Sequence, residues 1–457
     1  MIRRLLAAMT VIVLTLLSSQ PAAGTTYGTV DGVVNPPFCP NNIAPAAPPP
    51  NPSKHAAPSL SGRTDLSVGF TPGVIRVRVS CGHTITEVMQ KHQLSGIASN
   101  WSPPPFDIYD VRAGIDRSFR ITVARGLEKQ LVSRLATTGD FDWVQLDWQF
   151  PVSIAGPSSP QRFALSTSDP KLASQSNLTR ANFQHAWDRT VSFSAVIVAI
   201  LDSGLRATHE DAGQWKQYKG YDYVRNIETP AGTAIDTGCY SGHGTQVGTI
   251  AVGDTNNGKG VAGAGFNSGI LPMRVLNGGV CNIWAPSSRD WPIRWARLNG
   301  ALIVNMSYYQ SGPDPDEEAV MQESWYAGTT PVAAASNQGV PLDSTHAAYP
   351  CMYAYVVCVG ANDDSGTRCS VSSYSQSYVD FSAPAGTAWG AGSASNTSYI
   401  FDNCHTSYAA PLVSGAMALL RSLGYTPQQQ YNALSATATL NNWTIFGEIN
   451  AGAALWH

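Results

Sequence analysis

The second half of the chain alternates short, continuous apolar runs with stretches in which apolar residues recur every three or four positions. Continuous runs are typical of strands buried on both faces of a parallel sheet, whereas the wider spacing indicates helices. Strands are predicted at 195–201, 269–276, 301–307, 330–336 and 354–361, and helices at 243–251, 293–298 and 317–326. The pattern predicts an α/β sandwich around a central parallel sheet, with chemistry at the carboxyl ends of its strands.

A further helix is predicted in the stretch 405–420, HTSYAAPLVSGAMALL. Its apolar residues recur at helical spacing, Pro411 suits a first turn, and Gly424 marks the end. Ser407 is therefore expected at a helix N-terminus, where unpaired N–H groups favour a nearby negative charge. From this stretch alone, an N-capping serine and a nucleophile are equally good interpretations.

Residues 69–152 follow a different order of periodicities. Strands are predicted at 73–79, 106–111, 119–123 and 142–150, with helices at 84–94 and 127–136. This β-α-β-β-α-β order is that of a small α+β, ferredoxin-like domain. Such a fold says little about function by itself.

The remaining segments indicate an exported protein. Arg3 and Arg4 precede an apolar run at 5–17, which is followed by small residues up to Gly24, as in a secretory signal, and the run is too short to cross a membrane. Segment 36–58 is rich in Pro, Ala and Asn, and segment 151–175 in Ser and Pro. We expect a signal peptide at 1–24, a Pro-rich linker at 25–65, the ferredoxin-like domain at 66–153, a connecting segment at 154–176 and the α/β domain at 177–457.

Charge and cysteine content narrow the classes of partner. The net charge of the 457 residues is −3 and no basic run appears, which argues against nucleic acid or an anionic membrane surface as partner. Eight cysteines in an exported chain predict disulfides. Cys39 and Cys81 could pair with each other. The other six allow 15 pairings, and the partner of Cys404 is expected to brace the loop before Ser407.

Four polar residues stand where the pattern predicts a reactive site. Asp202 ends the first predicted strand, His243 stands between two glycines at a helix start, and Asn337 ends a later strand. An acid can orient an imidazole, the imidazole can activate the Ser407 hydroxyl, and a neutral amide can donate to an oxyanion. Taken singly, each residue also has an ordinary structural interpretation, so only their combination favours a catalytic site.

The order Asp, His, Asn, Ser occurs within motifs that resemble one family. The stretches AILDSG, HGTQVGTIA, IVNMSYY, VAAASNQG and TSYAAPLVSGAMALL resemble the motifs of subtilisin-like serine endopeptidases, the subtilases. GVAGAGFNSGILPMRVL and EINAGAAL resemble two more stretches of that family, so the resemblance runs from about 169 to the C-terminus. The ferredoxin-like domain resembles the family's inhibitory, fold-assisting propeptide.

The resemblance implies a role for each residue. Ser407 would attack the scissile carbonyl, His243 would transfer the proton, and Asp202 would orient the imidazole. Asn337 and the Ser407 backbone N–H would form the oxyanion hole. Substrate binding would fall to Ser307, Tyr308, Tyr309, Ala333, Ala334, Ala335 and Ser336.

The same resemblance implies a secreted, self-processing zymogen. Its substrates would be proteins or peptides, its own propeptide would inhibit it, and the chain would cut itself between about Pro151 and Lys171. We expect a monomer, no cofactor for the chemistry and no membrane span after signal removal. The resemblance also allows structural calcium, whose ligands and site residues the sequence leaves unknown.

Several residues depart from the family pattern. His405, Tyr408 and Gln246 stand where glycine, methionine and histidine are usual, and Tyr309 and Ser336 add bulk near the primary pocket. One alternative is therefore an inactive, peptide-binding relative. The other two are a nucleotide-binding α/β protein, which lacks its Gly-rich loop here, and a sedolisin-type acid peptidase, which would carry an acid in place of Asn337.

Overall fold

The computed structural model describes residues 64, 69–80, 83, 85–92, 118–149, 167–236, 242–276 and 289–457. The chain separates into two compact units, with residues 72–146 in the first and 147–457 in the second. The predicted signal, the Pro-rich linker apart from residue 64, the strand at 106–111 and most of the connecting segment lie outside the described residues.

The first unit contains two helices and three strands among its described residues. In chain order they are β1 (Gly69–Val79), α2 (Ile85–Lys91), β2 (Ser118–Thr122), α4 (Glu128–Leu135) and β3 (Phe141–Gln149). Strand β1 lies between β2 and β3 and pairs antiparallel with β2. The first, third and fourth predicted strands are thus neighbours in the order that a ferredoxin-like sheet requires.

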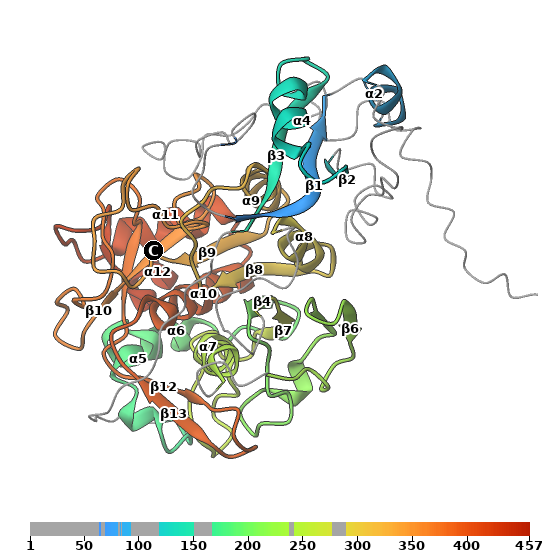
Figure 1. The fold of residues 1–457 in the computed structure, drawn as a ribbon. Helices are drawn as coiled ribbons and strands as arrows, with labels where there is room; N and C mark the ends of the chain where they lie inside the picture. The colour runs from blue at the N-terminus through green and yellow to red at the C-terminus, as the bar shows by residue number, and fades with distance from the viewer. Residues whose placement is uncertain are drawn as a thin grey trace, which may run out of the picture. The chain divides into compact units, whose positions relative to one another are not determined.

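The second unit is built on a nine-stranded sheet within the described residues, in the order β14-β11-β10-β9-β8-β4-β7-β5-β6 (Figure 1). All its pairs are parallel except that of the edge strand β6 with β5. The five predicted strands are β4 (Ile197–Asp202), β7 (Gly269–Arg274), β8 (Ala301–Met306), β9 (Thr330–Ala334) and β10 (Val357–Asn362). The predicted parallel sheet is confirmed.

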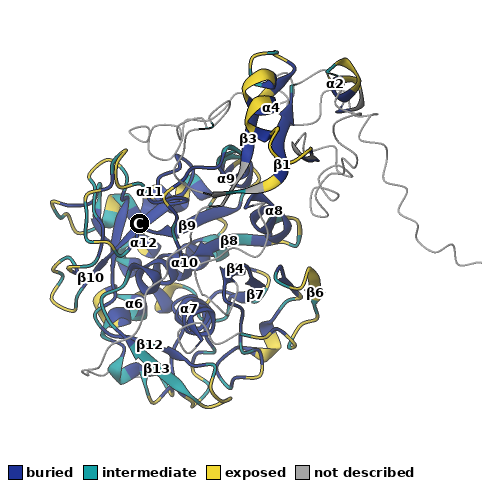
Figure 2. Cartoon of the chain, viewed as in Figure 1, coloured by how far each residue is buried: buried dark blue, intermediate teal, exposed yellow. Residues whose placement is uncertain are grey.

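Helices cover both faces of this sheet, so its central strands are buried, whereas the edge strand β6 is exposed (Figure 2). Helices α8 (Asp290–Leu298) and α9 (Pro315–Tyr326) lie on one face, and α7 (His243–Val252) and α10 (Thr406–Ser422) on the other (Figure 1). Strand β4 is buried along its whole length. This explains why the strands read as continuous apolar runs.

Shorter elements complete the second unit. They are η4 (Leu172–Ser174), α5 (Ser176–Arg180), α6 (Phe183–Arg189), η5 (Gln214–Lys216), β5 (Gly220–Asp222), β6 (Ile227–Thr229), β11 (Phe381–Pro384), β12 (Ala388–Ala391), β13 (Tyr399–Asp402), α11 (Pro427–Thr437), β14 (Gly447–Glu448) and α12 (Ala451–Trp456). Strands β12 and β13 form a separate antiparallel hairpin. Within the ranges that the structure describes, no helix has the length and apolar character needed to span a bilayer.

The start of helix α10 differs from the prediction. The helix begins at Thr406, so Pro411 lies inside it and the prediction that Pro411 belongs to the first turn was wrong. Proline lacks an N–H, and in a helix interior it leaves the carbonyl four residues earlier without its usual donor. That carbonyl belongs to Ser407, which therefore needs another partner.

Candidate active site

Asp202 lies at the carboxyl end of β4, where the order of the sheet reverses. After β4 the chain forms β5 and β6 at the edge of the sheet, returns to β7 next to β4, and then crosses to β8 on the other side of β4. Such a reversal leaves a crevice beyond the strand ends, which is where parallel α/β sheets bind their ligands. Asp202 is fully buried there, and its Oδ1 also accepts the Ser203 backbone N–H at 2.7 Å.

His243 opens helix α7 and faces Asp202. Its Nδ1 lies 2.8 and 3.0 Å from the two carboxylate oxygens of Asp202. Each flanking position requires glycine for a different reason. Gly242 has φ +103°, and a Cβ at Gly244 would lie 2.3 Å from the Gly204 carbonyl oxygen. The sequence therefore brings the helix start against the end of β4, as the prediction required.

The surroundings of His243 favour its charged form. Burial lowers the pKa of the imidazole, but the charge and hydrogen bond of Asp202, with the charges of Asp236 and Asp402, raise it above its usual value. The other nitrogen, Nε2, is buried without a hydrogen-bond partner among the described residues. An unpaired buried nitrogen is costly, and here it is the atom that a general base would use.

Ser407 lies in the first turn of α10 and is tied to β8 by two reciprocal bonds. The Ser407 hydroxyl donates to the Ser307 carbonyl at 3.0 Å, and the Ser307 hydroxyl donates to the Ser407 carbonyl at 2.8 Å. The second bond supplies the donor that Pro411 lacks. No hydrogen bond between Ser407 and His243 is found among the described residues. The ring of Tyr408, the residue after Ser407, lies 5.7 Å from the His243 imidazole.

Asn337 follows β9 and is fixed by the residue before Ser407. Its Oδ1 accepts both the backbone N–H of Thr406, at 2.8 Å, and the Thr406 hydroxyl, at 2.9 Å. Both bonds use the amide oxygen of Asn337, so its amide nitrogen remains as the group that can donate to a ligand. The Ser407 backbone N–H lies in the first helical turn, where N–H groups have no partner within the helix.

The predicted pocket residues lie on two adjacent segments. Ser307, Tyr308 and Tyr309 follow β8, and the stretch 333–336 ends β9; Tyr308 is fully buried and Tyr309 is half-buried. Ser336 has φ +78°, and its hydroxyl donates to that of Ser373 at 2.7 Å. The structure therefore places these residues beside Ser407, through Ser307, and beside Asn337.

A disulfide braces the loop before Ser407, as predicted. Cys404 pairs with Cys369, and a second disulfide joins Cys351 to Cys358. The remaining cysteines lie outside the described residues.

One charged residue near His243 lies outside the predicted motifs. Asp402, three positions before His405 and fully buried, contributes to the field at His243. The signal that could have found it is the Asp-x-x-His spacing directly ahead of Thr406–Ser407.

Among the residues that the structure describes, no group of three or more His, Cys, Asp and Glu is arranged to hold a metal ion. In the loop region around 253–261, both oxygens of Asp169 accept backbone N–H groups, of Asn256 and Asn257. Both oxygens of Asp211 likewise accept protein donors, among them the Val261 N–H and the Tyr399 hydroxyl. Structural calcium thus remains a prediction without assigned ligands.

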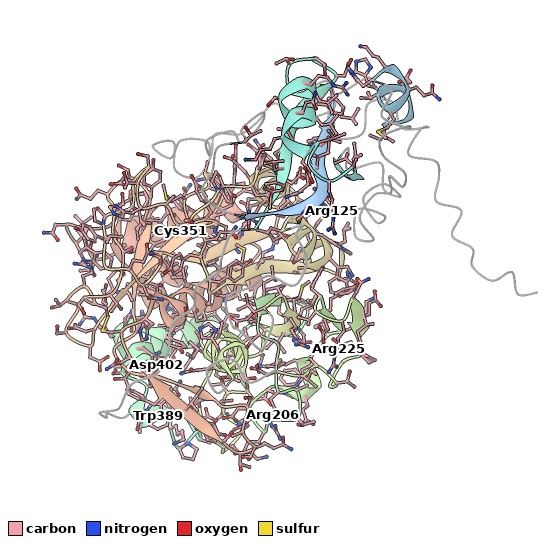
Figure 3. All side chains as sticks on the ribbon, in the orientation of Figure 1. Arg125, Arg206, Arg225, Cys351, Trp389 and Asp402 are labelled. Carbon is pink, nitrogen blue, oxygen red and sulfur yellow. A yellow bond between two sulfur atoms is a disulfide. The ribbon has the colours of Figure 1, made fainter. Side chains whose placement is uncertain are left out.

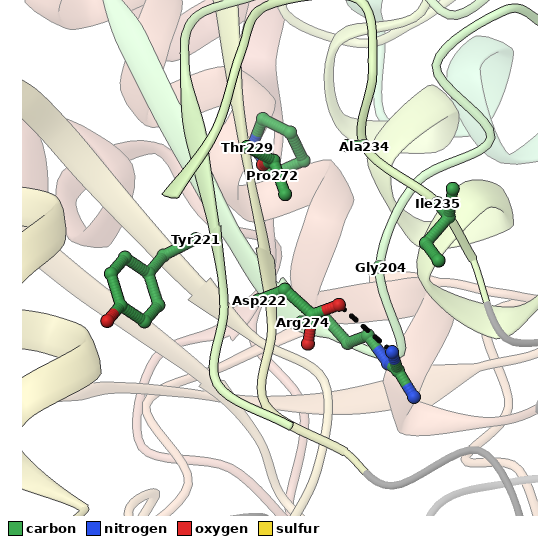
Figure 4. A pocket seen from close by; sticks show the side chains of 8 residues that line it. All are labelled: Gly204, Tyr221, Asp222, Thr229, Ala234, Ile235, Pro272 and Arg274. Carbon is green, nitrogen blue, oxygen red and sulfur yellow. Dashed lines mark hydrogen bonds and ion pairs between the residues drawn. The ribbon is translucent and has the colours of Figure 1, made fainter. Parts of the chain in front are cut away.

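A small pocket lies near the loop after Asp202 (Figure 4). Its lining residues are Gly204, Tyr221, Asp222, Thr229, Ala234, Ile235, Pro272 and Arg274. Arg274 and Asp222 form an ion pair of 3.0 Å in its wall. None of the predicted site residues lines it, so we assign it no part in the chemistry.

The comparisons with known proteins agree on one family. The subtilase family matches residues 194–448. Thermitase from Thermoactinomyces vulgaris is 31% identical over 253 residues, which cover 55% of this chain and 84% of thermitase. The thermophilic serine proteinase of Bacillus sp. (strain AK1) is 33% identical over 56% of this chain, which spans only 59% of that relative.

Among solved structures, fervidolysin from Fervidobacterium pennivorans, a keratinolytic enzyme related to subtilisin, shares the fold. Its TM-score is 0.67 at 21% identity, over 90% of this chain and 64% of its own. The chain belongs to the subtilase family. It is a serine endopeptidase with the subtilisin-like fold.

Proposed function

We propose that this chain hydrolyses peptide bonds through an Asp202–His243–Ser407 triad and an acyl-enzyme. The observation that carries the proposal is the buried contact between His243 Nδ1 and Asp202, 2.8 Å long, which leaves Nε2 unpaired beside the start of α10. In this arrangement Asp202 fixes the tautomer that exposes a basic Nε2.

The reaction requires the Ser407 hydroxyl to change partner. It donates to the Ser307 carbonyl in the described structure, and rotation about its χ1 bond would turn it toward His243 Nε2. His243 would then accept the proton as Ser407 Oγ attacks the scissile carbonyl, and would return it to the leaving amine. The Asn337 amide nitrogen and the Ser407 N–H would donate to the oxyanion.

We propose that the substrate binds as an added strand next to the segment after β8. Main-chain bonding of this kind gives affinity, and side-chain pockets give specificity. The backbone of Gln310 is already paired with Tyr349, at 2.9 and 2.8 Å, and is not free to bond a substrate strand. The bulk of Tyr309 and Ser336 supports a pocket narrower than one bordered by glycines.

Maturation is proposed to occur by self-cleavage ahead of Thr167. The described residues that follow Ser166 are built into the second unit: Asp169 caps the loop at 256–257, and the Lys171 N–H donates to the Gly260 carbonyl at 2.7 Å. This favours the amino-terminal part of the expected interval, between about Pro151 and Ser166. By this proposal the ferredoxin-like domain is the inhibitory propeptide of a secreted, monomeric enzyme whose signal occupies 1–24.

Intact-mass analysis tests the proposed self-cleavage, and kinetics with a peptide substrate test the proposed triad. The wild-type chain should lose its N-terminal domain and cleave a peptide substrate, while Asp202→Asn, His243→Ala and Ser407→Ala should lose at least about 10³-fold in kcat/KM. Ser407→Ala should also keep its N-terminal domain. A purified Ser407→Ala chain that processes itself normally would exclude self-cleavage by this triad.

A further inference from the structure

A second acidic residue reaches the neighbourhood of His243 on an element outside the family motifs. Asp402, which is labelled in Figure 3, ends β13. Its partner across the hairpin is Ala388 on β12. The Ala388 carbonyl accepts the Gln246 side chain of α7 at 2.9 Å. The hairpin is thereby fastened to the helix that begins with His243, and Asp402 is buried at its end.

The Asp402 carboxylate is connected to the first turn of α10. Its Oδ1 accepts the Asn403 N–H at 2.7 Å and lies 3.2 Å from His405 Nδ1. The Tyr408 ring lies 6.2 Å from the His405 ring and 5.7 Å from the His243 ring. Tyr408 therefore packs against both imidazoles, and burial, followed by the charge of Asp402, raises the pKa of its hydroxyl.

We propose that Asp402, paired with His405, whose ring packs on Tyr408, is a further positioning residue for His243. It would complement Asp202 in two ways: it would order, through the His405 ring, the Tyr408 ring that packs on the imidazole, and it would add a further negative charge to the field at His243. The inference rests on the proposed triad, because it assigns an effect on the general base.

The charge balance around His243 supports this effect. The titratable groups on the elements packed against it are Asp202 on β4, Arg274 on β7 with its partner Asp222 on β5, Asp236 ahead of α7, Asp402 on β13, His405 just before α10 and Tyr408 on α10. Arg274 is already paired with Asp222. The acids therefore dominate, and each favours the imidazolium that forms as Ser407 gives up its proton.

The role of His405 follows from the same geometry. A neutral residue at this position leaves the Asp402 charge acting on His243. A cation there offsets that charge. Two substitutions at position 405 can therefore vary the field at His243 without altering Asp402 itself.

The test is the pH profile of kcat/KM for a peptide substrate, measured on the mature enzyme that each full-length chain yields after processing. Its acidic limb reports the protonation of the general base in the free enzyme. Asp402→Asn should shift this limb to lower pH by about half to one unit, with about a three- to tenfold fall in kcat/KM on the plateau. His405→Lys should shift the limb in the same direction, whereas His405→Gln should not lower it.

Asp343→Asn is the matched control. Asp343 and His346 repeat the same i, i+3 pair of residue types on an exposed loop, with Nδ1 and Oδ1 3.4 Å apart. This variant should leave the limb in place. The inference would be overturned if Asp402→Asn left the acidic limb in place, or if His405→Lys and His405→Gln shifted the limb equally to lower pH.

Two further controls separate the possible failures. If Asp402→Asn does not fold, the comparison of His405→Lys with His405→Gln decides alone. If Ser407→Ala retains full activity, the proposed function fails as well. If it is inactive while every limb stays in place, only the inference about Asp402 fails.

Discussion

The bond between the Ser307 hydroxyl and the Ser407 carbonyl predicts that Ser307 and Pro411, far apart in sequence, are coupled in their effect on the free energy of unfolding. Pro411 cannot donate to that carbonyl, so Ser307→Ala should leave a buried acceptor without its donor. An unsatisfied buried acceptor costs about 1–3 kcal/mol. For a unit of this size the loss corresponds to a fall in Tm of about 2–6 °C.

A double-mutant cycle isolates this bond. Pro411→Ala restores an N–H four residues after Ser407, so the free-energy loss from Ser307→Ala should become smaller in the Pro411→Ala background. Thermal unfolding is best followed in Ser407→Ala chains, which keep the backbone carbonyl and are expected not to digest themselves. Equal losses with and without Pro411 would refute the idea that Ser307 replaces the missing helical donor.

Three other outcomes follow from the site and its supports. Asn337→Ala should lower kcat about 10²–10³-fold with little change in KM in steady-state assays, a magnitude carried over from subtilisin itself and not worked out from this structure; unchanged kcat would remove this residue from the oxyanion hole. Replacing Cys369 and Cys404 by serine should lower the free energy of unfolding by about 2–4 kcal/mol, measured by denaturant titration against the oxidised chain, because the bond closes a loop of 35 residues; equal midpoints would contradict this. Burial raises the pKa of Glu317 from 4.5 to about 7, so the folded state retains a proton that the unfolded chain releases in this window, and stability falls as pH rises through it. Glu317→Gln should therefore raise Tm above pH 7 by the equivalent of at most about 3 kcal/mol and leave it unchanged below pH 4.5, whereas a uniform change at every pH would assign the effect to packing.

The strands were predictable because their burial on both faces leaves a continuous apolar signature. The apolar runs at 195–201 and 301–307 correspond to β4 and β8, and the carboxyl end of β4 carries the predicted acid. The glycines around His243 were equally informative, since Gly242 and Gly244 have no substitute at that close approach.

The features that the sequence did not reveal depend on three-dimensional partners. Pro411 looked like a helix start because proline is favoured there, and only the Ser307 hydroxyl explains how the helix continues through it. The Cys369–Cys404 pairing was one of many combinations. Asp402 was overlooked because its importance arises from a hairpin packed against α7, a contact that no local pattern encodes.

The most direct test of the proposed active site is covalent labelling with a serine-directed phosphonate, followed by intact-mass analysis and peptide mapping. The wild-type chain should gain one phosphonyl group on Ser407, and the label should disappear in Ser407→Ala and slow strongly in His243→Ala. A label on another residue, or undiminished labelling of Ser407→Ala, would contradict the assignment of Ser407 as the nucleophile.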